Sequence, residues 1–238
     1  DTVEETVTVG GTLLRLIDTA GLRDTPDRVE QMGVERSRAA MESAELILVL
    51  WDSSSPVTQE DGELLCQATS LAPTVLVRSK SDLLSAPLPL LSLDPMPPVV
   101  ELSARTGQGL EELEQEIARR AALLPDAAPE MLKAGTDILV EYQRGSVIEK
   151  GLFETWDMFN SIKAGPVKEG RDGWYQEVWP QGRDRNGTRN AEKGFILEYG
   201  TSRIEQTHWM SEANDAAKDE VVEAMRKVWL EYVERMES

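Results

Sequence analysis

The sequence predicts two folds in one chain: an α/β fold over residues 1–125 and an α+β fold over residues 126–238. A hairpin pattern followed by alternating helical and buried-strand patterns predicts the first, because such alternation is typical of a sheet with helices on its faces. Long helical patterns around a short aromatic strand predict the second. Trp51 is the only aromatic residue of the first part, and all the others follow residue 125. Two separate hydrophobic cores are therefore expected.

The composition is that of a globular protein, since 40% of the 238 residues are apolar. The net charge of -18 argues against a general nucleic-acid or anionic-membrane surface, although a local basic site stays open. The single cysteine, Cys66, cannot form an internal disulfide, and no apolar run approaches the roughly 20 residues that span a bilayer. We expect a cytoplasmic protein with no membrane partner. Because the chain opens on Asp1 without a Met, we also expect translation to begin upstream.

The first predicted element is a β-hairpin. Val3–Val9 alternates apolar and polar residues, Gly10 and Gly11 suit a tight turn, and Thr12–Ile17 is a second apolar run. Further helices are predicted over residues 34–44, 58–71 and 110–124, and buried strands over residues 46–50, 74–77 and 99–102.

Local signals refine these elements. Thr58 and Asp61 form a variant of the capping box at the start of the helix over 58–71. Residues 83–98 are rich in Leu, Ser and Pro and are predicted to form a loop. Pro125 and Pro129 flank small residues, so we expect them to interrupt any helix and to mark the domain boundary.

Three short motifs follow predicted strands of the first part: Asp-Thr-Ala-Gly at 18–21, Ser-Lys-Ser-Asp at 79–82 and Ser-Ala-Arg at 103–105. Ligands of an α/β sheet bind at the carboxyl ends of its strands. An aspartate such as Asp18 can hold Mg²⁺ through water, and a glycine such as Gly21 lets a backbone N–H approach a γ-phosphate. Asp82 can accept two hydrogen bonds from the N–H edge of guanine. Together the three motifs indicate a guanine-nucleotide site.

With these motifs in this order, residues 1–124 resemble the tRNA-uridine modification GTPases of the MnmE (TrmE) type, most densely over residues 16–44. The resemblance implies GTP and GDP as ligands, Mg²⁺, potassium in the intact family, and a partner flavoprotein that joins in modifying the wobble uridine of tRNA. It implies that Asp18 is linked to Mg²⁺, that Gly21 senses the γ-phosphate and that Glu30 orients the attacking water. For Glu30, a solvated loop carboxylate is the alternative. The residues implied to hold the base are Ser79, Lys80, Asp82, Ser103, Ala104 and Arg105.

Two departures from this family change the expectation. Ser79 stands where the family has Asn, so one hydroxyl replaces a two-point hydrogen bond, at a cost of about 1 to 3 kcal/mol in guanine binding. No Gly-x-x-x-x-Gly-Lys-[Ser/Thr] loop occurs in the 238 residues. This loop cradles the phosphates, and its strand is central to the family's sheet. We therefore expect that the P-loop GTPase sheet is incomplete and that the chain does not hydrolyse GTP.

The second part contains four predicted helical segments and one strand, Trp174–Trp179. The helical segments are residues 130–143, 152–162, 191–199 and 211–236, the last with an apolar stripe. His208 has no second His to form a metal site and is interpreted as structural. Residues 181–190 are predicted to form a loop whose Arg183, Arg185 and Arg189 either bind an anion or are solvated.

Residues 191–202, followed by Thr-His-Trp-Met at 207–210 and a long acidic helix, resemble small phage head-tail joining or tail-completion proteins. This resemblance implies a non-catalytic subunit that forms homo-oligomers or contacts a phage tail or portal partner. Two hypotheses result: an inactive tRNA-modification GTPase fragment fused to a phage-like segment, or a phage tail protein with a vestigial GTPase fragment. The junction near residue 125 is open to three origins: a working fusion, a gene interrupted by a prophage, and a chimera of joined sequences.

Overall fold

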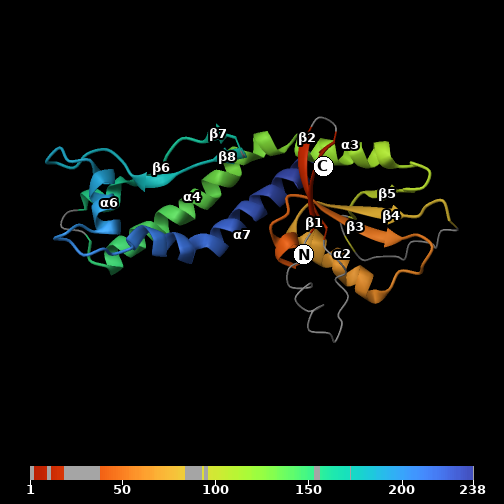
Figure 1. Cartoon of the computed structure of the whole chain (residues 1–238), viewed down its shortest axis with the longest axis horizontal. Helices are drawn as coiled ribbons and strands as arrows, with labels where there is room; N and C mark the ends of the chain where they lie inside the picture. Colours follow the sequence, from red (N-terminus) through yellow and green to blue (C-terminus); the bar gives the residue numbers. More distant parts are fainter. Residues whose placement is uncertain are drawn as a thin grey trace. The chain divides into compact units, whose positions relative to one another are not determined.

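The structure is a computed structural model that describes residues 3–9, 12–18, 38–83, 93, 96–152, 156–171 and 173–237. The chain divides into two compact units, residues 1–124 (unit 1) and residues 125–236 (unit 2) (Figure 1). None of the described helices is both long enough and apolar enough to cross a membrane.

Unit 1 contains an antiparallel hairpin and a parallel sheet. The hairpin strands are β1 (Val3–Val9) and β2 (Thr12–Asp18), as predicted. The sheet has the order β3-β4-β5, with β3 at Ile47–Asp52, β4 at Thr74–Ser79 and β5 at Val99–Glu101. Among the described strands, no hydrogen-bonded ladder joins the hairpin to the sheet. The parallel sheet confirms the α/β prediction for the first part.

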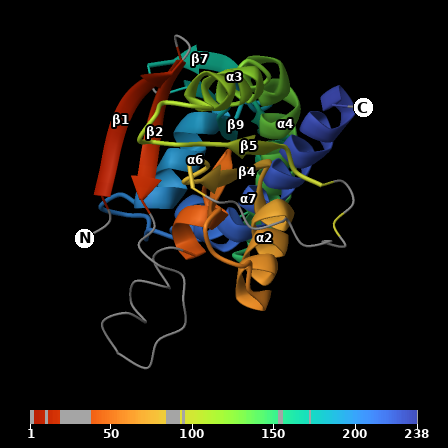
Figure 2. The ribbon, with the colours of Figure 1, turned by 90° about the vertical axis from the view of Figure 1, so that its right-hand side faces the viewer.

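Two helices cover opposite faces of the parallel sheet, α2 (Gln59–Leu71) and α3 (Leu110–Ala121) (Figure 2). Leu65 of α2 is fully buried in a cluster with Trp51 and Leu76, and on the other face Leu113 of α3 packs against Val75 and its neighbours. The predicted capping box of α2 is present. Residues 38–42 are also helical, within the range predicted for a helix.

Unit 2 is built on two long antiparallel helices, α4 (Leu124–Glu149) and α7 (Trp209–Glu237). They contact each other through polar pairs, for example Gln143 Nε2 to Asn214 Oδ1 at 3.0 Å. The remaining elements are α5 (Asp157–Ser161), β6 (Ile162–Ala164), β7 (Lys168–Gly170), β8 (Gly173–Tyr175), β9 (Val178–Pro180) and α6 (Asn190–Tyr199). Strand β6 pairs with β9 and β7 pairs with β8, both antiparallel.

The core of unit 2 lies where α4, α5, β6, β9 and α7 meet. Its buried side chains are Val147, Met158, Ile162, Val178 and Trp209. Trp209 is completely buried, and its indole Nε1 donates to the carbonyl oxygen of Gly194 at 3.0 Å. This bond satisfies the only polar atom of the side chain, as a buried tryptophan requires.

Several predicted elements are wrong in detail. Helix α4 continues through Pro125 and Pro129. Pro125 lies in the first turn, where a backbone N–H would have no helical partner, so its loss costs no hydrogen bond. Pro129 lies just beyond this turn and removes a single helical hydrogen bond. The predicted strand Trp174–Trp179 is split between β8 and β9, which belong to different two-stranded sheets. Strand β3 includes Trp51 and Asp52, and it is not buried on both faces, since Leu50 is 62% exposed.

Candidate functional site

The turns after β4 and β5 lie side by side at the carboxyl edge of the parallel sheet. Leu102 N donates to Arg78 O at 2.8 Å, and Ser81 N donates to Leu102 O at 3.1 Å. These bonds extend the ladder past the end of the strands. They bring together the two motifs that the sequence predicts to read a purine base, residues 79–82 and 103–105.

Asp82 is held by the turn after β5. The hydroxyl of Ser103, which is fully buried, donates to Asp82 Oδ1 at 2.6 Å, and this bond is the main reason why the pKa of Asp82 lies below its ordinary value. Asp82 Oδ2 lies 3.7 Å from Nη1 of Arg105, whose side chain is 82% exposed. The carboxylate is thus ionised at neutral pH, oriented through one oxygen and only loosely contacted at the other.

The turn at 103–109 presents unused backbone donors. It is closed by Ser103 N to Gln108 O at 3.0 Å and by Gly107 N to Ser103 O at 2.9 Å. Among the hydrogen bonds of the described residues, none uses the amides of Ala104 or Arg105, and both residues are exposed. Two N–H groups next to a fixed carboxylate can bind a group that offers both an acceptor and donors.

Lys80 is anchored by a residue that the sequence analysis missed. Its backbone has a φ of 57°, and its Nζ pairs with Asp52 Oδ2 at 2.6 Å. The other oxygen of Asp52 accepts from the amide of Ser54 at 2.9 Å and from its hydroxyl at 2.6 Å. The available signal was an acidic residue directly after an apolar run, at the same sheet edge as the two motifs.

Ser79 uses its hydroxyl within the sheet. Its Oγ donates to the carbonyl oxygen of Trp51 at 3.1 Å, while its own carbonyl accepts from Ser53 N at 2.9 Å. Ser79 therefore ties β4 to β3, and its hydroxyl proton is not directed to the Asp82 turn.

The structure describes little of the residues predicted for the phosphate side. Asp18 ends β2 in the hairpin, and nothing is described of its side chain. Gly21 and Glu30 lie outside the described residues. Within the described ranges, no group of three His, Cys, Asp or Glu side chains could hold a metal ion.

Acid should weaken the Asp52–Lys80 link. The hydrogen bond that Lys80 donates to Asp52, and to a smaller extent those from Ser54, lower the pKa of Asp52 from 3.8 to about 2. A carboxylate whose pKa is lower in the folded state than in the unfolded state stabilises the fold at any pH above its unfolded pKa. This contribution is lost as the pH falls through the folded-state pKa. We expect the protection of the β3 and β4 amides against hydrogen exchange, measured relative to the intrinsic exchange rate at each pH, to fall between pH 3.8 and about 2. Asp52→Asn should flatten this pH dependence, and an unchanged slope would contradict the assignment.

Unit 2 offers an anchored loop and an exposed histidine. Asp184 is buried, accepts from Asn186 N and Thr188 N at 2.9 and 2.8 Å, and pairs with Lys193. Arg185 forms an ion pair with Asp157 through two hydrogen bonds, at 2.9 and 3.2 Å. The predicted loop over residues 181–190 is thus fixed to the rest of unit 2.

His208 is exposed, with a φ of 50°.

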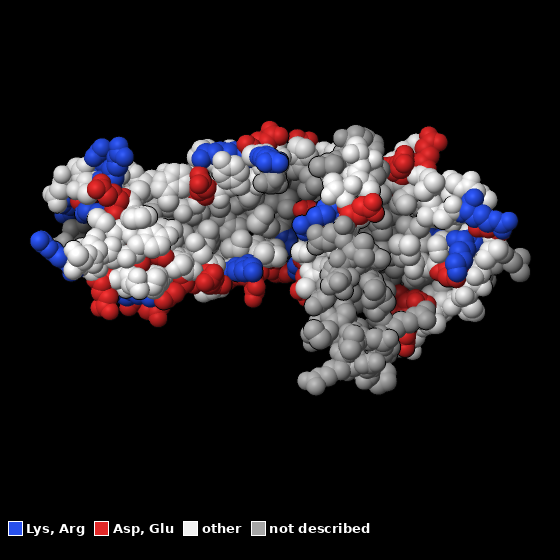
Figure 3. Space-filling model, in the orientation of Figure 1, with Lys and Arg blue, Asp and Glu red and all other residues white. Residues whose placement is uncertain are grey.

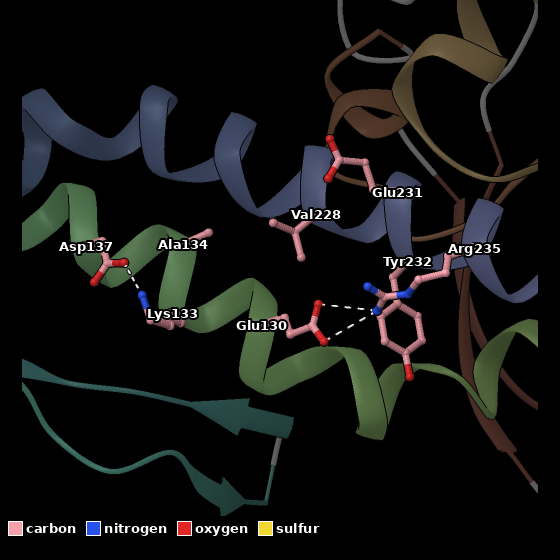
Figure 4. A pocket seen from close by; sticks show the side chains of 8 residues that line it. All are labelled: Glu130, Lys133, Ala134, Asp137, Val228, Glu231, Tyr232 and Arg235. Carbon is pink, nitrogen blue, oxygen red and sulfur yellow. Dashed lines mark hydrogen bonds and ion pairs between the residues drawn. The ribbon is translucent and has the colours of Figure 1, made fainter.

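A cavity of about 310 Å³ lies between α4 and α7 (Figure 4). Its charges are already paired: Lys133 contacts Asp137 at 2.5 Å, and Arg235 contacts Glu130 at 3.4 Å. The Arg235 guanidinium also lies 4.8 Å from the centre of the Tyr232 ring. The cavity is therefore a groove of the helix pair with no free charge of one sign to select a ligand.

Acidic side chains gather along the lower edge of unit 2 in Figure 3, where Figure 1 places α7. The exposed acidic residues of the first half of α7 are Glu212, Asp215, Asp219, Glu220 and Glu223. Such a surface repels polyanions, in agreement with the net charge of -18.

Comparisons with known proteins concern mainly the first part. Residues 1–80 match the family model described as 50S ribosome-binding GTPase. The tRNA modification GTPase MnmE of Nitrosomonas europaea is 42% identical over 144 residues, which cover 60% of this chain and 30% of that protein. The MnmE of Lactiplantibacillus plantarum is 43% identical over 121 residues, covering 50% of this chain and 26% of that protein. The chain thus spans less than a third of these relatives.

A solved structure of Era from Aquifex aeolicus is 16% identical, covers 92% of this chain and 75% of Era, and has a TM-score of 0.43. The family match and the parallel sheet together support a P-loop GTPase-like α/β fold for the first part. Over about half of its length, the chain is therefore homologous to the G domain of the tRNA modification GTPase MnmE.

Proposed function

We propose that residues 1–125 are a G domain whose carboxyl sheet edge binds the base of a guanine nucleotide. The observation that carries this proposal is the Asp82 carboxylate, fixed through Ser103 Oγ at 2.6 Å, next to the unused amides of Ala104 and Arg105. Guanine offers two N–H donors to a carboxylate and a carbonyl acceptor to backbone amides. Adenine has an amino group where guanine has the carbonyl, so it does not match this set.

The remaining base-site residues have supporting roles in this proposal. The Lys80 stem lies along the base plane, and Ser79 contributes only to strand spacing, because its hydroxyl donates to Trp51 O. We expect a lower guanine affinity than an Asn at this position would give. Mg²⁺ would be linked to Asp18, Gly21 would sense the γ-phosphate and Glu30 would orient water, all by homology alone.

Nucleotide binding by the full chain tests the proposal. Calorimetric titration with GDP and with ADP should show GDP binding at least about tenfold tighter, since a mismatched base leaves buried polar groups unpaired. Asp82→Ala should abolish this preference. Glu114→Ala, an exposed carboxylate on α3, is the matched control and should leave it unchanged. Equal affinities for GDP and ADP, or an Asp82→Ala variant that still prefers GDP, would overturn the proposal.

Hydrolysis is not part of the proposed activity of this chain. The 238 residues contain no phosphate-binding loop to stabilise the transferred phosphoryl group. Steady GTP turnover by the purified chain, above that of Asp82→Ala, would contradict this. A role in cytoplasmic tRNA wobble-uridine modification with a partner flavoprotein is proposed for the longer protein type that the homology indicates.

For residues 126–238 we propose a structural role as a self-assembling, phage-like α+β segment, a tail-completion or head-tail joining subunit. The favouring observation is helix α6, which exposes Phe195 and Tyr199 by 63% and 61%. Exposed adjoining aromatic residues are typical of interaction surfaces.

A further inference from the structure

Both carboxylate oxygens of Asp52 are used in hydrogen bonds. Oδ1 accepts from the amide of Ser54 at 2.9 Å and from its hydroxyl at 2.6 Å, and Oδ2 accepts from Nζ of Lys80 at 2.6 Å. Asp52 lies at the end of β3, where it is paired in register with Ser79 of β4. The carboxylate is therefore fixed by its own loop and holds the side chain of the next strand's turn.

Lys80 and Asp82 belong to one turn, which Leu83 N closes by donating to Lys80 O at 3.0 Å. Asp82 is held from the side of β5, by Ser103 Oγ at 2.6 Å, whereas Nζ of Lys80 is held from the side of β3. Because β4 lies between β3 and β5, the two side chains are drawn to opposite sides of the turn. The methylene stem of Lys80 thus extends along the carboxyl edge of the sheet towards β3.

The Asp52–Lys80 pair contributes little to the stability of the fold. The side chain of Lys80 is 59% exposed and that of Asp52 is 33% exposed. An exposed ion pair is weakened by solvent and by the entropy lost when a long side chain is fixed. That entropy is lost before any ligand arrives. A ligand that contacts the stem does not have to order it, and such preorganisation increases affinity.

We propose that Asp52 is a positioning residue for the base: by holding the ammonium of Lys80, it fixes the methylene stem as an apolar surface on which the nucleotide ring lies. Lysine stems cover apolar surface in this way while the charged head stays in water. A row of methylene groups offers no hydrogen bond, so it contacts guanine and adenine alike. Asp52 therefore increases the affinity for the base, whereas Asp82 selects guanine. This inference rests on the proposed guanine site and assigns a further residue to it.

Titration of the full chain with guanosine and adenosine, followed by amide chemical shifts in NMR, tests this role. Both nucleosides are uncharged, so a freed Lys80 ammonium cannot attract them through a phosphate. Asp52→Asn should weaken the binding of both by the same factor, about three- to tenfold, which is the effect of having to order one long side chain. Glu63→Gln is the matched control, since Glu63 is an exposed carboxylate on α2 that accepts from Gln59 Nε2 at 2.8 Å. It should leave both affinities unchanged.

Lys80→Met separates the positioning role of Asp52 from its structural role in its own loop. Methionine keeps an unbranched apolar side chain but has no ammonium for Asp52 to hold. In the Lys80→Met background, Asp52→Asn should therefore have no further effect on the binding of either nucleoside. An equal loss of affinity in both backgrounds would overturn the proposal, because Asp52 would then act through its bonds to Ser54. Near-ultraviolet circular dichroism checks that each variant is folded.

The outcomes separate this inference from the proposed function. A wild-type chain that binds guanosine and adenosine equally overturns the guanine site and the inference with it. A wild-type preference for guanosine, combined with unchanged affinities in Asp52→Asn, overturns the positioning role alone. A loss of that preference in Asp52→Asn also overturns the positioning role, since Asp52 would then distinguish the two bases itself.

Discussion

Gly109→Ala is expected to destabilise unit 1 by about 3 kcal/mol or more, because the added methyl group meets backbone. Gly109 has a φ of 78°, and a Cβ there would lie 1.9 Å from Glu101 O and 2.9 Å from Glu101 C. A clashing side chain could rotate away, but the atoms met here are the backbone carbonyl of Glu101, which is fixed in strand β5. The turn at 103–109 must shift as a whole, and the Ser103–Asp82 hydrogen bond shifts with it.

Gly107→Ala is the matched control. Gly107 has a φ of 79°, and its Cβ would meet only Leu110 Cδ1, at 3.9 Å. The Gly107→Ala variant should lose only about 1 kcal/mol in the free energy of unfolding, since an alanine there adopts a positive φ but meets no close atom. Hydrogen exchange of the β4 and β5 amides would measure both variants. Equal losses at the two positions would show that the close approach to Glu101 does not matter.

Trp209→Ala is expected to destabilise unit 2 by about 3 to 5 kcal/mol, through lost burial and the cavity left behind. The side chain is fully buried in the cluster with Val147 and next to Gly194, and it is the largest completely buried side chain of the described residues. The variant also leaves the carbonyl of Gly194 without its indole donor. Trp209→Phe should cost less, since a ring still fills most of the volume.

Trp174→Ala is the control that separates the effect of losing a buried side chain from the effect of losing a tryptophan as such. Trp174 lies on β8 and is 39% exposed, so its replacement should change stability by less than about 1 kcal/mol. Chemical denaturation, followed by helical circular dichroism, would compare the two tryptophan variants. If both lowered the midpoint equally, the core assigned to unit 2 would be wrong.

Local signals predicted much of unit 1. The hairpin and the capping box of α2 lie where sequence placed them, because turn glycines and a Thr-x-x-Asp spacing act within a few residues. The placement of Ser79 and Asp82 at a common sheet edge also followed from the alternation of strands and helices. Lys80 pairing with Asp52 could not be predicted, since the two residues meet only through the parallel register of β3 and β4.

Unit 2 was less predictable because its features depend on long-range packing. Prolines 125 and 129 suggested a break, yet α4 tolerates both near its start. The alternation over Trp174–Trp179 is real, but it covers two strands, β8 and β9, that pair with different partners in separate sheets. On α6, Phe195 and Tyr199 are exposed while Leu197 packs against the core, since Trp209 and the start of α7 require Gly194 and Glu198 on the inner side.

The left-handed backbone of Lys80 has a consequence for how this sheet edge could change over time. A φ of 57° in a non-glycine residue costs on the order of 1 to 3 kcal/mol, and a glycine would remove that strain. The same exchange would delete the ammonium that neutralises Asp52. Mutational drift towards a more stable turn would therefore remove the Lys80–Asp52 pair first, so a lysine retained at position 80 records selection for something other than the stability of this turn.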